Sequence, residues 1–168
     1  SMGLTPMGGL IMGSRPGDFD PSIIFFLANN LNMSLKEVDT LLNKKSGFKG
    51  LTGENDLREI LARYDDGNPL ARLAIQMYIY KIKKYIGAYT AILGRLDAVI
   101  FTAGVGENSA FVREQVCDDL GVLGIEIDKK LNLEVSSGIK EFNQADSRVK
   151  LLVVPTNEEL EIANQTVR

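Results

Sequence analysis

The stretch that decides the fold is Ala98-Val99-Ile100-Phe101-Thr102-Ala103-Gly104-Val105-Gly106-Glu107-Asn108-Ser109. Its apolar, β-favouring residues predict a short buried strand over 99–101. Gly104 and Gly106 let the backbone of the next loop approach a ligand closely, and Asn108 or Ser109 can cap a helix predicted over 109–120. Backbone N–H groups at such a helix start favour phosphate or another anion. An ordinary strand-to-helix turn explains the same residues, so both interpretations stay open here.

Length and composition narrow the class of protein. A chain of 168 residues with 45% hydrophobic and 24% charged residues is typical of one globular domain. The charged residues are scattered along the chain and give a net charge of −3, so no basic face indicates binding to nucleic acid. No apolar run is long enough to span a membrane, and the uncharged stretch from Met2 to Ser14, which lacks a basic n-region, is not expected to be a signal peptide. The single cysteine, Cys117, excludes an internal disulfide and fits the reducing cytoplasm.

The absence of histidine restricts the chemistry further. Ser-His-Asp triads, histidine general acids and histidine metal sites are excluded within this chain. A metal would have to be bound by carboxylates, carbonyls or water, which favours Mg²⁺ over Zn²⁺.

A second buried strand is predicted over 150–154, where Lys150-Leu151-Leu152-Val153-Val154 is ended by Pro155. The closing helix follows it, with Thr156 as its expected cap and with Glu158 and Glu159 in its first turn. The two glutamates can serve a site, or they can simply stabilise the helix dipole.

An arginine stands in a loop near the start of the chain, within Gly13-Ser14-Arg15-Pro16-Gly17-Asp18-Phe19-Asp20-Pro21. Asp20 and Pro21 predict a helix over 21–31. The planar fork of Arg15 suits phosphate or carboxylate recognition, because it can donate two parallel hydrogen bonds. A solvated Arg15 that pairs with Asp18 is the alternative.

The middle of the chain is predicted to be helical. Ser34 and Glu37 form a capping box for a helix over 35–45, and residues 46–54 are expected to be a turn-rich connection. Asp56 can cap a short helix over 57–64, although Asp56 and Arg58 can also serve a site. The longest helix is predicted over 69–94, and its apolar surface is broad enough to contact both a sheet and another element or second subunit. Two weaker strands are expected over 125–128 and 139–142, with a helical turn over 128–135 between them.

These elements predict an α/β domain with ligands at the carboxyl edge of the strands. Three candidate segments are then expected to come together: Gly104–Asn108, the turn at Asn157 and Glu158, and the Arg15 loop. A glycine-rich segment, a carboxylate for Mg²⁺ and an arginine are the parts required for phosphoryl transfer. The chain has no Walker A motif.

Four segments of the chain closely resemble the acetate kinase (acetokinase) family: Met2-Gly3-Leu4-Thr5-Pro6, Met12-Gly13-Ser14-Arg15-Pro16-Gly17-Asp18-Phe19-Asp20-Pro21, Phe101-Thr102-Ala103-Gly104-Val105-Gly106-Glu107-Asn108-Ser109 and Pro155-Thr156-Asn157-Glu158-Glu159. The resemblance covers essentially the whole chain but only the C-terminal part of that enzyme. It implies a helix-rich α/β domain of the actin-like and sugar-kinase-like (ribonuclease H-like) type, the C-terminal half of a two-domain kinase. Residues 1–168 are then expected to be a single nucleotide-binding and dimerisation domain, without the N-terminal domain.

The resemblance also implies roles for particular residues. Arg15 would stabilise the phosphoryl group in the transition state, and Glu158 would bind Mg²⁺, with Mn²⁺ as an alternative. The residues implied to bind ATP or ADP are Asp56, Leu57, Arg58, Gly104, Val105, Gly106, Glu107 and Asn108. Ser14, Pro16 and Phe19 are conservative departures from the family, whereas segment 51–56 is shorter than usual.

The reaction implied by the resemblance converts ATP and acetate into ADP and acetyl phosphate by in-line transfer. The implied partners are these substrates and a second copy in a homodimer, with no nucleic acid or membrane. Because the family's acetate pocket and catalytic aspartate lie upstream of Ser1, the chain alone is expected to be inactive. A propionate kinase of the same family and a non-catalytic nucleotide-binding or dimerisation module are the alternatives.

Overall fold

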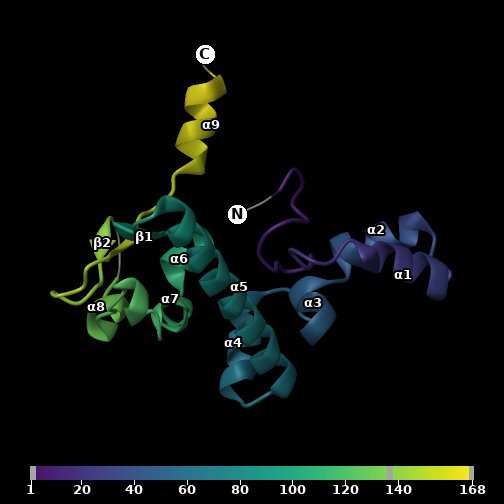
Figure 1. The fold of residues 1–168 in the computed structure, drawn as a ribbon, viewed down its shortest axis with the longest axis horizontal. Coiled ribbons are helices and arrows are strands. Elements are labelled where there is room, and N and C mark those ends of the chain that lie inside the picture. Colours follow the sequence, from purple (N-terminus) through teal and green to yellow (C-terminus); the bar gives the residue numbers. More distant parts are fainter. Residues whose placement is uncertain (1–2, 136–137, 167–168) are drawn as a thin grey trace. The chain divides into compact units, whose positions relative to one another are not determined.

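The computed structural model describes residues 3–135 and 138–166, and the chain divides into two compact units after Tyr85. The helix α5 (Pro69–Leu93) begins in the first unit and ends in the second (Figure 1). The expectation of a single domain over 1–168 stays a prediction. None of the helices in the described ranges combines the length and the apolarity that crossing a membrane requires.

The first unit is helical. It contains α1 (Ser22–Asn30), α2 (Leu35–Lys44), α3 (Gly47–Thr52), α4 (Leu57–Asp65) and the larger part of α5. The predicted capping box is formed, since Ser34 Oγ accepts from the Glu37 N–H and the Glu37 carboxylate accepts from the Ser34 N–H. The prediction of a turn-rich connection over 46–54 was wrong, because α3 occupies most of it.

The broad apolar surface of α5 is only partly buried. Ile75 and Ile79 are buried in the first unit, whereas Leu70, Leu73 and Met77 remain exposed. Past Tyr85, Ile86 packs against the core of the second unit. The face of α5 that carries Ile75 and Ile79 is therefore turned to the interior. The face that carries Leu70, Leu73 and Met77 leaves apolar surface exposed.

The second unit contains a small mixed sheet. Its elements are β1 (Ala98–Phe101), α6 (Ala103–Asn108), α7 (Ala110–Cys117), the 3₁₀ turn η1 (Gly121–Leu123), α8 (Lys129–Leu133), β2 (Lys140–Glu141), β3 (Lys150–Val153) and α9 (Glu158–Thr166). The strand order is β1-β3-β2, with β1 parallel and β2 antiparallel to β3. The strand predicted over 125–128 is reduced to one bridge, between Ile127 and Asn143.

One apolar core supports this sheet. Its buried members are Cys117, Ile125, Ile127, Phe142, Val149, Leu151 and Val153. Val99 of β1 pairs with Leu151 of β3, so both predicted strands are present in parallel register. The helix-rich composition and the mixed sheet confirm the predicted α/β class.

Candidate functional site

An open pocket of about 460 Å³ lies where the chain leaves β1 and β3. It is lined by Ala103 and Gly104 from the start of α6, by Thr156 and Asn157 from the connection into α9, and by Glu159 from the first turn of α9. The carboxyl ends of parallel neighbouring strands meet at one sheet edge, which is where open α/β sheets bind ligands. Two of the three predicted segments are therefore brought together. Glu158 is the first residue of α9, and its side chain lies outside the described part of the structure.

The segment expected to be a glycine loop is a short helix, α6, which corrects that prediction. The chain enters it through Thr102 in an extended conformation and Ala103 at φ +58°, a left-handed value that costs a non-glycine residue free energy. Asn108 Nδ2 donates to the carbonyl of Gly104 at 2.8 Å. Ser109 then caps α7 by accepting from the Val112 N–H, as the sequence predicts.

The two glycines of α6 have different surroundings. A Cβ added to Gly104 would meet no heavy atom within 4 Å. A Cβ added to Gly106 would lie 3.1 Å from the carbonyl carbon of Phe101 in β1. Gly104 thus leaves the pocket open, while Gly106 allows α6 to pack closely on the strand before it.

Glu107 joins α6 to the connection between β3 and α9. Its Oε1 accepts from both the N–H and the hydroxyl of Thr156, each at 3.0 Å. These hydrogen bonds, the Thr156 N–H first, hold the pKa of Glu107 below its ordinary value. Thr156 was expected to cap α9, but Asn157 does so, since its Oδ1 accepts from the Leu160 N–H at 2.9 Å.

The sequence did not mark Arg113, which is only 2% exposed on α7. Its guanidinium donates to the carbonyls of Gly106 and Glu107, at 2.9 and 2.8 Å. It also donates to the side-chain and main-chain oxygens of Asn132, at 2.7 and 2.9 Å. Burial lowers the pKa of Arg113. An arginine within an amphipathic helix resembles a solvent-exposed residue, so only the tertiary structure reveals it.

In the first unit, the loop that carries Arg15 is held by the amino end of α3. The N–H groups of Ser46, Phe48 and Lys49 donate to the carbonyls of Ser14, Met12 and Gly13, at 3.1, 3.0 and 2.8 Å. Gly47 makes this approach possible, because its φ is +63° and an added Cβ would lie 2.2 Å from the Met12 oxygen.

The side chain of Arg15 is partly buried, and its Nε donates to Asn43 Oδ1 at 3.3 Å. The pairing with Asp18 considered above is not formed among the described residues. Asp18 accepts instead from the Gly9 N–H at 2.6 Å and from the Tyr85 hydroxyl. The Tyr85 hydrogen bond, followed by that of Gly9, lowers the pKa of Asp18.

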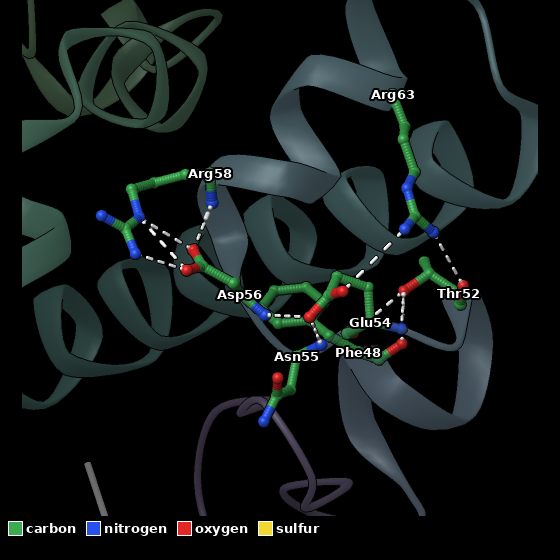
Figure 2. A network of polar contacts seen from close by, with 7 residues as sticks. All are labelled: Phe48, Thr52, Glu54, Asn55, Asp56, Arg58 and Arg63. Carbon is green, nitrogen blue, oxygen red and sulfur yellow. Dashed lines mark hydrogen bonds and ion pairs between the residues drawn. The ribbon is translucent and has the colours of Figure 1, made fainter.

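The segment of Asp56, Leu57 and Arg58 lies next to the Arg15 loop, since a Cβ on Gly13 would be 3.1 Å from the Asn55 oxygen. Figure 2 shows that Asp56 accepts from both the main chain and the guanidinium of Arg58. The guanidinium, followed by the main-chain N–H, lowers the pKa of Asp56 to about 2. Asp56 therefore caps α4, as the sequence allowed, and Arg58 remains 89% exposed beside it.

A second acidic residue orders the turn before Asp56. The Glu54 carboxylate accepts from the N–H groups of Asn55 and Asp56, at 2.7 and 3.0 Å, and lies 3.9 Å from Arg63 (Figure 2). These bonds fix the path of the chain into α4.

A metal at the pocket would meet oxygen donors. The polar residues that line it, Thr156, Asn157 and Glu159, offer hydroxyl, amide and carboxylate oxygens. Among the described residues no group of three or more His, Cys, Asp or Glu is arranged to hold a metal. This set fits a hard cation such as Mg²⁺, which keeps several waters and uses one or two carboxylates with substrate phosphates.

Comparison with known proteins gives a consistent result. The model of the acetokinase family matches residues 1–164. The acetate kinase of Syntrophobacter fumaroxidans is 52% identical over 168 residues, which are all of this chain and 41% of that protein.

Solved structures agree with the sequence comparison. The crystal structure of Porphyromonas gingivalis acetate kinase superposes with a TM-score of 0.91 at 44% identity, covering 98% of this chain and 42% of that one. A propionate kinase from Francisella tularensis also reaches a TM-score of 0.91, at 40% identity and the same coverage. The chain thus spans about two fifths of the length of these relatives. It belongs to the acetokinase family.

Proposed function

We propose that this chain is the nucleotide-binding part of an acetate kinase, which transfers the γ-phosphoryl group of ATP to acetate and forms ADP and acetyl phosphate. The observation that carries the proposal is the pocket at the sheet edge. Gly104 lines it with no side chain in the way, opposite Thr156, Asn157 and Glu159. Membership of the acetokinase family supplies the chemistry that such a pocket would serve.

Each of the two units contains residues that we propose to bind the nucleotide. In the second unit, Gly104, Val105, Gly106, Glu107 and Asn108 form the backbone against which the nucleotide lies. Glu107 acts there mainly by holding Thr156 in place. In the first unit, Asp56, Leu57 and Arg58 contribute to the nucleotide site, and Arg58 is exposed enough to contact a ligand.

Arg15 is proposed as the residue that stabilises the phosphoryl group during transfer. Its Nε is bonded to Asn43, and its loop is anchored on α3. A guanidinium fixed in this way offers its terminal nitrogens to the three equatorial oxygens of the phosphoryl group.

Glu158 is proposed to bind Mg²⁺, with Mn²⁺ as an alternative. A divalent cation offsets the charge on the β- and γ-phosphate oxygens when it is bound. The residues beside Glu158 that line the pocket provide oxygen atoms for the water shell of the cation.

Propionate is the second candidate for the acyl substrate, because a propionate kinase structure matches as well as an acetate kinase structure. We place the acyl pocket outside this chain, and we expect the chain alone to form no acetyl phosphate or ADP from acetate and ATP. Robust turnover in that assay would contradict the expectation.

A homodimer is proposed, because α5 exposes apolar residues such as Leu70 and Leu73 that a second copy could cover. The cytoplasm is the proposed location of the protein.

Calorimetric titration of MgADP tests the proposed site. The wild type is expected to bind, and Gly104→Val to bind at least about tenfold more weakly, because the new side chain enters the pocket. Gly87→Val is the matched control, since an added Cβ on Gly87 in α5 also meets no heavy atom within 4 Å. It should bind as the wild type does. A module without a nucleotide site would show no heat with any variant.

A further inference from the structure

The guanidinium of Arg113 contacts the predicted nucleotide segment from its buried side. Its Nη1 donates to the carbonyls of Gly106 and Glu107, at 2.9 and 2.8 Å. Both carbonyls belong to the last turn of α6, where helical carbonyls lack partners within the helix. Arg113 therefore supplies the hydrogen bonds that this helix end needs.

The other side of the guanidinium is anchored in the core. Nε and Nη2 donate to Oδ1 and the carbonyl of Asn132, which is fully buried near the end of α8. The Asn132 amide donates in turn to the Ala110 carbonyl at 2.9 Å. The guanidinium carbon also lies 5.6 Å from the ring centroid of Phe142. One planar group thus joins the ends of two helices and fixes both to the core.

Only an arginine can make this set of contacts. Its donors form a rigid fork, whereas a lysine offers one nitrogen on a flexible stem. All four acceptors are neutral oxygens, so the contacts depend on the direction of each N–H more than on pairing with a carboxylate. Replacing the guanidinium would leave the partly buried carbonyls of Gly106 and Glu107 without these hydrogen bonds.

We propose that Arg113 is the positioning residue of the nucleotide site: it holds α6 in the conformation in which Gly104 faces the open pocket. This inference rests on the proposed function. A helix of six residues has little stability of its own. Its binding conformation must therefore be maintained by tertiary contacts. Arg113 donates hydrogen bonds to the end of α6 that lies away from the pocket, and Glu107 joins α6 to Thr156.

Two measurements on the unliganded and MgADP-titrated chain test the proposal. Hydrogen exchange of the amides of residues 106–109 reports on the conformation of α6, and calorimetry gives the Kd of MgADP. In Arg113→Lys we expect about tenfold faster exchange and about tenfold weaker binding of MgADP. These changes are expected when the fraction of molecules whose α6 is in the binding conformation falls to about a tenth. Asn132→Leu, which removes the anchoring oxygen, should weaken binding by about threefold.

Val149→Ala is the control for general loss of stability, because Val149 is fully buried in the same core. It should lower the melting temperature and leave both the exchange at 106–109 and the Kd as in the wild type. Unchanged Kd and exchange in Arg113→Lys would overturn the proposal. If Arg113→Lys does not fold, unchanged values in Asn132→Leu would overturn it. A wild type that binds no MgADP refutes the proposed function, and the exchange of residues 106–109 still decides whether Arg113 holds α6.

Discussion

Gly104 and Gly106 are separated by one residue, yet the structure assigns them opposite tasks. Gly104→Ala is expected to leave the free energy of unfolding unchanged or to raise it by up to about 1 kcal/mol, because alanine favours the helix and meets no atom. Gly106→Ala is expected to lower it by about 1 kcal/mol or more, because its methyl group would press on the backbone of Phe101. Urea unfolding measures both. Equal effects of the two substitutions would contradict the distinction.

The carboxylate of Asp56 makes a contribution to the free energy of unfolding that depends on pH. Its pKa is about 2 in the folded chain against an ordinary value of 3.8. A lowered pKa means that the contribution is present above about pH 4 and is lost as the pH falls towards 2. A ¹³C NMR titration of the carboxyl carbon should give this pKa in the wild type and a value closer to 3.8 in Arg58→Ala.

Arg63→Ala serves as the control for that titration. Arg63 lies 3.9 Å from Glu54, and it makes no contact with Asp56 in the network drawn in Figure 2. The Asp56 pKa should therefore stay near 2 in this variant. An Asp56 that titrates near 3.8 in the wild type would refute the account.

Most local signals at single residues were predictable, although Asn157 caps α9 in place of Thr156, and long-range signals were not. Ser34, Asp56 and Ser109 cap helices as expected, because a cap depends on neighbours within three residues. The task of Arg113 depends on Asn132, 19 residues further along the chain. No pattern in the sequence around Arg113 carries that information.

At the scale of elements, α3 shows how a distant segment can create a helix. Residues 47–52 have no clear apolar period, and their helix begins where carbonyls of Met12, Gly13 and Ser14 accept its first N–H groups. The sequence predicted a connection here because the partners lie 32 to 36 residues upstream. The same contacts hold the Arg15 loop.

Gly47 is therefore expected to be the more sensitive of the two glycines at the ends of α3. Gly47→Ala combines a left-handed φ with a Cβ 2.2 Å from the Met12 oxygen, and should cost about 3 kcal/mol of stability. Gly53, at the other end of α3, has φ +77° and open space around an added Cβ, so Gly53→Ala should cost only about 1 kcal/mol. Thermal unfolding followed by circular dichroism compares them. Equal costs would show that the approach of the loop to Gly47 is unimportant.

At the scale of the whole molecule, the class of fold could be predicted from the sequence, but the division of the chain into two units could not. The two apolar runs around Val99 and Leu151 predicted two buried strands of an α/β domain, each followed by a helix start, and the structure pairs these strands in parallel. The division after Tyr85 falls within α5, where the sequence continues its helical pattern without a break. The pocket was predictable in part, because Gly104 and Asn157 both follow a strand, whereas the glycine loop proved to be a helix.

The central claim is that the nucleotide lies between α6 and the start of α9. An NMR titration of the ¹⁵N-labelled chain with MgADP tests it most directly. The largest amide shift changes are predicted for residues 103–108 and 156–159, which line or support the pocket. Changes centred instead on the pocket formed by Thr90, Arg95 and Arg148, or no changes at saturating MgADP, would contradict the claim.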